Sequence, residues 1–149
     1  MNGREDGFTL LELLVVLVIL AGAAVIAYPR LGAVAPLAQM HAGAIELNAT
    51  VRTARSTALR SNAEQSLTID SGARTYWTSF DRRARLIAPR VTVEVAGTGV
   101  EQVTASRSVI RFRPDGSAAD AVITLRDGRV VAALTIDWLT GASRLDWRR

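Results

Sequence analysis

Glu12 is the residue whose surroundings most clearly demand a chemical explanation. With Thr9, it is one of two clearly polar side chains in an apolar run of about twenty residues over positions 8–27. As a helix rising about 1.5 Å per residue, that run is about 30 Å long and matches the hydrocarbon core of a bilayer. A carboxylate in a membrane-spanning helix costs about 2.5–3.5 kcal/mol on insertion scales, and much less beside an ammonium group. We therefore expect a positively charged group to lie beside the Glu12 carboxylate.

The rest of the chain offers little further chemistry. The absence of cysteine excludes disulfides, thiolate metal sites and a cysteine nucleophile. His41 is the only histidine, so a histidine-rich metal site is impossible, and we expect it to have a surface or packing role. Asp115 and Asp120 flank Gly116, but no further ligands follow at the spacing of a metal loop, so we interpret them as part of a turn. We expect no catalytic residue, no metal, no cofactor and no enzymatic activity.

Arginine supplies all the positive charge, because the chain has no lysine and a formal net charge of +4. Its clusters permit two interpretations. Merged, they could bind a nucleic-acid backbone with steep salt dependence. We favour a solvated face, or contacts to other subunits, with Asp81, Asp137 and Asp146 as ion-pair partners, and we expect the three tryptophans to anchor the sheet core. The clusters are Arg82, Arg83 and Arg85, which we expect in a loop; Arg107, Arg111 and Arg113; and Arg144, Arg148 and Arg149.

Four interpretations compete for the N-terminus. A secretory signal peptide needs a basic start and an apolar core of about 7–15 residues. In this chain the residues before the apolar run contain two acids, Glu5 and Asp6, and one base, Arg4, and the apolar run is longer than such a core. A plain transmembrane anchor fits the length but gives no reason for Glu12. A buried helix of a soluble protein is rarely this long and this apolar. The fourth interpretation starts from the residues around Glu12.

The stretch Gly7-Phe8-Thr9-Leu10-Leu11-Glu12 and the apolar residues after it resemble the class III signal of type IV pilins and of the pseudopilins of type II secretion. Such signals have a short polar leader ending in Gly, followed by Phe, with Glu at the fifth mature position. Leaders of this type usually carry net positive charge, and this one is slightly acidic.

The resemblance implies that a prepilin peptidase cleaves between Gly7 and Phe8 and N-methylates Phe8. The new α-amino group has a reference pKa of about 7.7–8.0. It lies four residues before Glu12, on nearly the same helix face. In the family, the fifth-position Glu is thought to pair with a mature N-terminus when subunits stack. Glu12 is thus expected to act in assembly.

A second helical segment follows the apolar run. Pro29, Gly32 and Pro36 permit either a linker or a bent continuous helix, and we favour the bent helix. From position 37 the apolar residues recur every three or four positions, which predicts one stripe packed on a sheet, ending near Ser61 and Asn62. The stripe is Leu37, Met40, Ala44, Leu47, Val51, Ala54 and Ala58.

After Asn62 the apolar period becomes two, which predicts an antiparallel sheet. A Gly loop over 71–73 and Asp127-Gly128 predict two hairpins. The predicted strands cover 65–70, 74–80, 90–96, 108–113, 121–126, 129–138 and 145–147. One long helix followed by such a sheet is an α+β arrangement.

Several C-terminal motifs resemble the H-type minor pseudopilin of type II secretion. They are Arg52 to Ala58 on the helix, Phe112 to Ser117, Ile123 to Leu125 with Asp127-Gly128, and Ile136 to Gly141. The resemblance implies a pilin-like fold and a minor pseudopilin that supports pseudopilus assembly and export of folded proteins across the outer membrane. The alternative is a minor type IV pilin in pilus assembly or DNA uptake, for which Arg144, Arg148 and Arg149 are the candidate nucleic-acid contacts.

The expected organisation follows from both resemblances. It comprises a leader (1–7), a transmembrane and assembly helix (8–28), an amphipathic helix half (29–62) and a periplasmic sheet domain (63–149). The implied protein crosses the inner membrane once, with a cytoplasmic leader. Its implied partners are the prepilin peptidase/N-methyltransferase, other pseudopilins in a hetero-oligomeric filament and, in the alternative, nucleic acid.

Overall fold

The computed structural model describes residues 10–148, and for residues 24–36 it describes the backbone alone. The chain forms two compact units, Met1–Ala35 and Pro36–Arg149. One helix, α1 (Leu10–Ser61), supplies residues to both units. Its backbone is helical through Pro29 and Pro36, so these prolines do not open a linker between two helices. The bend expected at Pro29 stays a prediction.

Within the second unit, α1 buries the stripe that its period predicts. Met40, Ala44, Leu47, Val51, Ala54 and Ala58 are each at most 1% exposed, whereas Leu37 is 39% exposed and lies outside the core. The helix ends at Ser61 because Asn62 adopts a left-handed conformation with φ 49°, which asparagine tolerates better than most residues.

A five-stranded antiparallel sheet, with strand order β3-β2-β1-β6-β5, follows the helix. Sequence-distant β1 and β6 pair along their whole length, from Gln65 opposite Phe112 to Asp70 opposite Arg107. On β6, Ile110 and Phe112 are buried and Arg111 is exposed, as the alternation predicts. The strands are β1 (Gln65–Asp70), β2 (Thr75–Thr78), β3 (Arg85–Leu86), β5 (Glu101–Gln102) and β6 (Arg107–Phe112).

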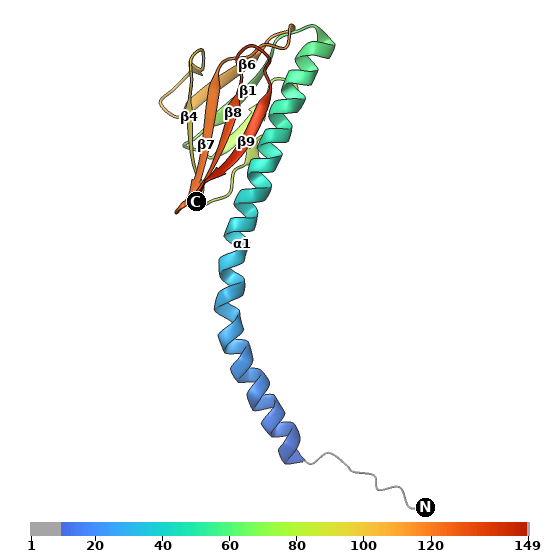
Figure 1. Ribbon diagram of the computed structural model, residues 1–149, viewed down its shortest axis with the longest axis vertical. Helices are drawn as coiled ribbons and strands as arrows, with labels where there is room; N and C mark the ends of the chain where they lie inside the picture. The colour runs from blue at the N-terminus through green and yellow to red at the C-terminus, as the bar shows by residue number, and fades with distance from the viewer. Residues whose placement is uncertain (1–9, 149) are drawn as a thin grey trace, which may run out of the picture. The chain divides into compact units, whose positions relative to one another are not determined.

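A second antiparallel sheet has four strands in the order β4-β7-β8-β9. In this unit, the last strand runs beside α1 (Figure 1). Ser143 Oγ donates a hydrogen bond to Asn48 Oδ1 at 2.6 Å, and the Trp147 indole stacks on the His41 ring at 3.9 Å. The strands are β4 (Thr92–Ala96), β7 (Ala121–Asp127), β8 (Val130–Ile136) and β9 (Ser143–Arg148).

The α+β class is confirmed, but the single expected sheet is two sheets. β4 pairs with β7 of the second sheet, and the β6–β7 connection passes from one sheet to the other. The short strands β3 and β5 were not expected, because two residues carry no readable alternation; Arg85, expected in a loop, lies in β3. One hydrophobic cluster joins the buried faces of α1 and of both sheets.

Two turns are shifted from their expected positions. Arg74 has φ 53°, so β2 begins one residue late, at Thr75. Asp127 pairs with Val130, so the two central turn residues are Gly128 and Arg129, and Gly128 takes the positive φ of 58°. Such a turn suits a hairpin, because its twist matches that of the strands.

The tryptophans do not anchor the core, contrary to expectation. Trp138 is 59% exposed because β8 ends at Ile136, so Trp138 does not share the buried face of Leu134. Trp147 is 37% exposed against His41. Trp77 is half-buried under the Arg107 guanidinium, whose carbon lies 5.5 Å from the ring centre.

Gly43 offers a first test of the helix. It lies inside α1, and a Cβ added there would meet no atom within 4 Å. Alanine loses less backbone entropy than glycine on folding, so Gly43→Ala is expected to stabilise the protein by about 0.5–1 kcal/mol. Urea unfolding followed by circular dichroism measures this. A destabilised Gly43→Ala variant would contradict the packing described around this face.

Candidate assembly site

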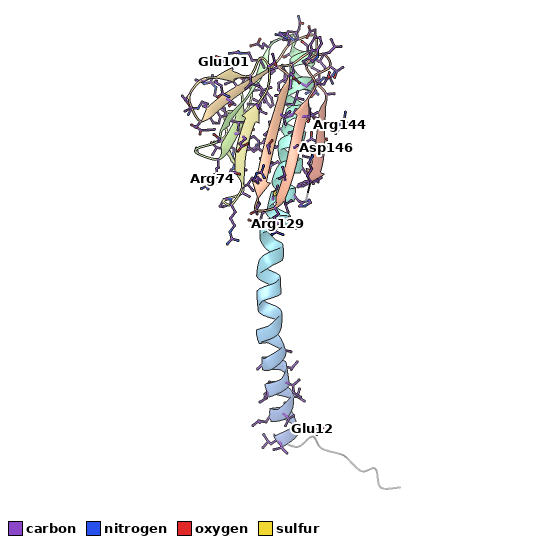
Figure 2. The ribbon with its side chains drawn as sticks, turned by 60° about the vertical axis from the view of Figure 1, so that its left-hand side comes forward. Glu12, Arg74, Glu101, Arg129, Arg144 and Asp146 are labelled. Carbon is purple, nitrogen blue, oxygen red and sulfur yellow. The ribbon has the colours of Figure 1, made fainter. Side chains whose placement is uncertain are left out.

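The described part of the first unit is an exposed apolar helix carrying one acid. Glu12 lies in the first described turn of α1 (Figure 2), and its neighbours along the sequence are leucines and valines. Every residue from 10 to 23 is exposed, including Leu10 at 89% and Leu11 at 74%. An apolar surface of this extent marks contact with a membrane or with other chains. Gly7 and Phe8 lie outside the described residues.

Among the residues that the structure describes, no helical stretch meets the length and hydropathy needed to cross a membrane.

In the second unit, Arg55 joins α1 to two distant loops. Its Nε donates hydrogen bonds to the carbonyl oxygens of Thr140 at 2.6 Å and Gly116 at 3.3 Å. The three residues come from three of the motifs that carry the sequence resemblance. The structure therefore gives these motifs one shared role, which is to fix both loops to the end of the helix.

Glycine is required in both loops because the backbones approach so closely. Gly116 has φ 85° and Gly141 has φ 61°, conformations that L-residues rarely adopt. A Cβ on Gly141 would lie 2.3 Å from the Gly116 oxygen and 3.1 Å from Arg55 Cδ. The sequence shows both glycines and both turns. It does not show that Arg55 meets them, because helical periodicity only places Arg55 off the buried stripe.

Side-chain caps stiffen both loops. Asp137 Oδ1 accepts hydrogen bonds from Thr140 N at 2.8 Å and Thr140 Oγ1 at 2.7 Å. Asp115 Oδ1 accepts the equivalent hydrogen bonds from Ser117 N at 2.9 Å and from Ser117 Oγ at 2.7 Å. The hydrogen bond from the side-chain hydroxyl is the largest cause, followed by the one from the backbone N–H, and together they hold the pKa of both carboxyls below the ordinary value of 3.8. Asp115 thus caps a turn, as interpreted.

The Asp137 cap predicts a titration that can be measured. Its lowered pKa stabilises the fold fully above pH 3.8, and that stabilisation is lost as the pH falls through the native value. Thr140→Val removes the hydroxyl donor and is expected to move the pKa of Asp137 back up, measured by carboxyl NMR titration. Thr135 is an exposed threonine on β8, so Thr135→Val is the matched control and should leave the pKa of Asp137 unchanged. Equal shifts in the two variants would contradict the cap.

The expected ion pairs of the arginine clusters form only in part. Arg85 pairs with Asp81 at 3.1 Å, and Arg111 pairs with Glu64 at 2.7 Å and Glu101 at 2.6 Å. Asp137 caps Thr140 instead of pairing with arginine. Within residues 10–148, no group of three or more possible ligands stands at a metal-binding arrangement.

The candidate nucleic-acid contacts are only partly described. Arg144 and Arg148 are exposed on one face of β9 with Asp146 between them, and Arg149 lies outside the described residues. An acid between two cations weakens their joint attraction for phosphates. These contacts stay a prediction.

Two known sequence families match different parts of the chain. The family described as "Type II transport protein GspH" matches residues 43–141. The prokaryotic N-terminal methylation motif matches residues 2–28. No curated protein matches the sequence.

Solved structures confirm the pilin-like α+β fold. The type IV minor pilin FimU of Pseudomonas aeruginosa (strain PAO1) is 14% identical, with a TM-score of 0.56 over 72% of this chain and 87% of that chain. The minor pseudopilin EpsH from the type 2 secretion system of Vibrio cholerae is 10% identical, with a TM-score of 0.57 over 72% and 96%. The match over 43–141 decides the family, and the chain belongs to the type II transport protein GspH family as a minor pseudopilin with a prepilin-type N-terminus.

Proposed function

We propose that this minor pseudopilin is built into a short hetero-oligomeric pseudopilus, where it supports filament assembly and the export of folded proteins across the outer membrane. The match of residues 43–141 to the GspH family carries the proposal. The role is structural: the chain is a substrate of the processing enzyme and a component of the filament.

The N-terminus acts as a processing signal in this proposal. Prepilin peptidase cleaves between Gly7 and Phe8 and methylates Phe8, and residues 8–28 hold the subunit in the inner membrane with the leader in the cytoplasm and the sheet domain in the periplasm. The methylation motif over residues 2–28 and the exposed apolar surface over residues 10–23 support this assignment.

Glu12 has the assembly role. In a filament the apolar helices are buried against one another, where a carboxylate needs a cationic neighbour. The ammonium group of a mature Phe8 supplies that cation, from the same chain or from an adjacent one. Pairing of these two groups sets the register in which the subunit joins the filament.

A minor type IV pilin remains the second candidate. The fold is as similar to FimU as to EpsH, so fold alone does not separate pilus from pseudopilus. Under this alternative Arg144, Arg148 and Arg149 would contact DNA.

Deleting the gene in its own host separates the candidates. Loss of export of folded exoproteins, with DNA uptake and pilus formation unchanged, is the expected result, and the full chain supplied in trans should restore export. Normal export together with lost DNA uptake or lost pili would overturn the proposal.

A further inference from the structure

One end of the second unit carries five arginines that come from three separate turns and two strands. This basic end consists of Arg74, Arg90, Arg126, Arg129 and Arg148. All five are exposed, and among side chains that the structure describes none lies within 4.0 Å of a carboxylate oxygen. The sequence clusters did not reveal this group, because only the fold brings its members together.

Strand register brings three of the five together. Val131 on β8 pairs with Arg126 on one side and with Arg148 on the other, so the two arginines flank it in one row of the sheet. Arg129 occupies the turn that begins two residues after Arg126. Side chains in one row of adjacent strands point to the same face, so these charges form a continuous surface.

The remaining two, Arg74 before β2 and Arg90 before β4, lie in connections between strands. Arg74 Nη1 donates a hydrogen bond to the Pro89 oxygen at 2.7 Å, which fixes it beside Arg90. Arg90 lines a hollow of about 230 Å³ with Asp127 and with Gln39 of α1. Figure 2 shows Arg74 and Arg129 toward the end of this unit where residues 37–40 of α1 lie, and Glu101 toward the other end.

The opposite end of the unit has carboxylates beside its arginines. There Arg111 is held by Glu64 and Glu101, while Asp115 and Asp137 cap loops near Arg55. At the basic end, Asp127 lines the hollow beside Arg90, and Glu94 lines a second hollow with Arg74 and Arg90. The five arginines of the basic end thus outnumber the two carboxylates, Asp127 and Glu94, that line hollows beside them.

The basic end is joined to the proposed membrane segment by a short piece of chain. Residues 29–35 separate positions 8–28 from the second unit, and they span at most about 25 Å even when fully extended. We propose that the basic end rests on anionic phospholipid headgroups of the membrane that holds residues 8–28, before the subunit enters the filament. This inference rests on the membrane anchoring in the proposed function.

Lipid suits this surface better than nucleic acid. DNA would be attracted to the same charges, but the short connection over residues 29–35 keeps this end within reach of the bilayer. Each arginine held near an anionic bilayer strengthens binding about fivefold. That attraction falls off within a Debye length, which shortens from about 8 Å at physiological salt to about 3 Å at 1 M.

The test uses the full chain in vesicles with a single fluorescent label. The chain has no cysteine, so Ala73→Cys labels the basic end and Ala142→Cys labels the opposite end, both at exposed alanines. Energy transfer to a headgroup-labelled lipid is compared in phosphatidylglycerol-containing and in pure phosphatidylcholine vesicles. Transfer from position 73 is expected to be higher with phosphatidylglycerol and to fall at about 1 M salt, while transfer from position 142 changes little.

Charge variants then identify the surface. Replacing Arg126, Arg129 and Arg148 by Gln is expected to lower the ratio of docked to undocked subunits about 100-fold. Replacing Arg52, Arg60 and Arg113 by Gln removes the same charge at exposed positions and should leave the ratio unchanged. Equal transfer in the two lipids, or equal losses in the two triple variants, would overturn the inference. Micromolar binding of short duplex DNA that only the first triple variant loses, with lipid-independent transfer, would assign the surface to nucleic acid instead.

Membrane insertion is measured separately, by resistance of the chain to alkaline extraction from the vesicles. An extracted chain contradicts the anchoring in the proposed function. Its salt-sensitive flotation with phosphatidylglycerol vesicles would then still support the basic end, and lipid-independent flotation would overturn it.

Discussion

Glu12→Gln is expected to leave the chain inserted and cleaved but to reduce its incorporation into filaments by at least about 100-fold. Removing one partner of a buried ion pair costs about 3–5 kcal/mol, because the other charge is left uncompensated. The substitution keeps the size of the side chain and removes only its charge. The uncompensated group would be the mature α-amino group of Phe8. Such a cost falls on the filament, where subunits are buried, and not on processing, which precedes assembly.

Matched variants separate charge from packing. Glu12→Asp retains the carboxylate and should keep part of the assembly, whereas Glu12→Ala should behave as Glu12→Gln. Processing is read from the mass of the chain, and incorporation from its amount in sheared filaments. Normal incorporation of Glu12→Gln would contradict the pairing, and an unprocessed Glu12→Gln chain would place Glu12 in peptidase recognition instead.

Gly97→Ala is expected to destabilise the fold by about 3–5 kcal/mol, a large share of the about 5–15 kcal/mol that holds a domain together. Gly97 has φ 151°, and an added Cβ would lie 1.9 Å from the backbone oxygen of Asp120 and 2.7 Å from Ala121 Cα. These are backbone atoms at the start of β7, so no side-chain rotation can relieve the clash. The end of β4 would have to move away from β7.

Gly128→Ala is the control for backbone conformation. Gly128 has φ 58°, but a Cβ there would meet nothing within 4 Å, so its replacement should cost only the left-handed strain of about 1–2 kcal/mol. Urea unfolding of both variants gives the difference. Equal costs would show that the close approach of β4 to β7 is absent in solution.

Local patterns in the sequence predict the elements of this fold well. The stripe from Met40 to Ala58 follows from helical periodicity, because a helix can bury only one face against a sheet. The hairpin near Gly128 follows from turn chemistry. Both features depend on residues a few positions apart, and both are confirmed to within one residue, apart from Leu37 at the start of the stripe.

Non-local pairing is what the sequence leaves open. Alternation shows that β4 has one buried face, but not that it pairs with β7 in a second sheet. The same limit hides the bonds of Arg55 to Gly116 and Thr140, which lie far along the chain. Trp138 was expected in the core because strand ends are poorly marked, and a strand that ends at Ile136 leaves the indole exposed.

The N-terminal signal differs from these features because it is local chemistry. Cleavage after Gly7, methylation of Phe8 and pairing of Glu12 depend on residues within one or two helical turns, so sequence suffices to propose them. Gly7 and Phe8 lie outside the described residues, and experiment must supply their test.

Quantitative mass spectrometry of purified filaments tests the central claim most directly. Pseudopili and type IV pili sheared from the same host would be digested and compared for peptides of this chain. The chain is expected in the pseudopilus fraction as a minor component whose first residue is N-methylated Phe8. A chain found only in type IV pili, or one in pseudopili that still begins at Met1, would contradict the account.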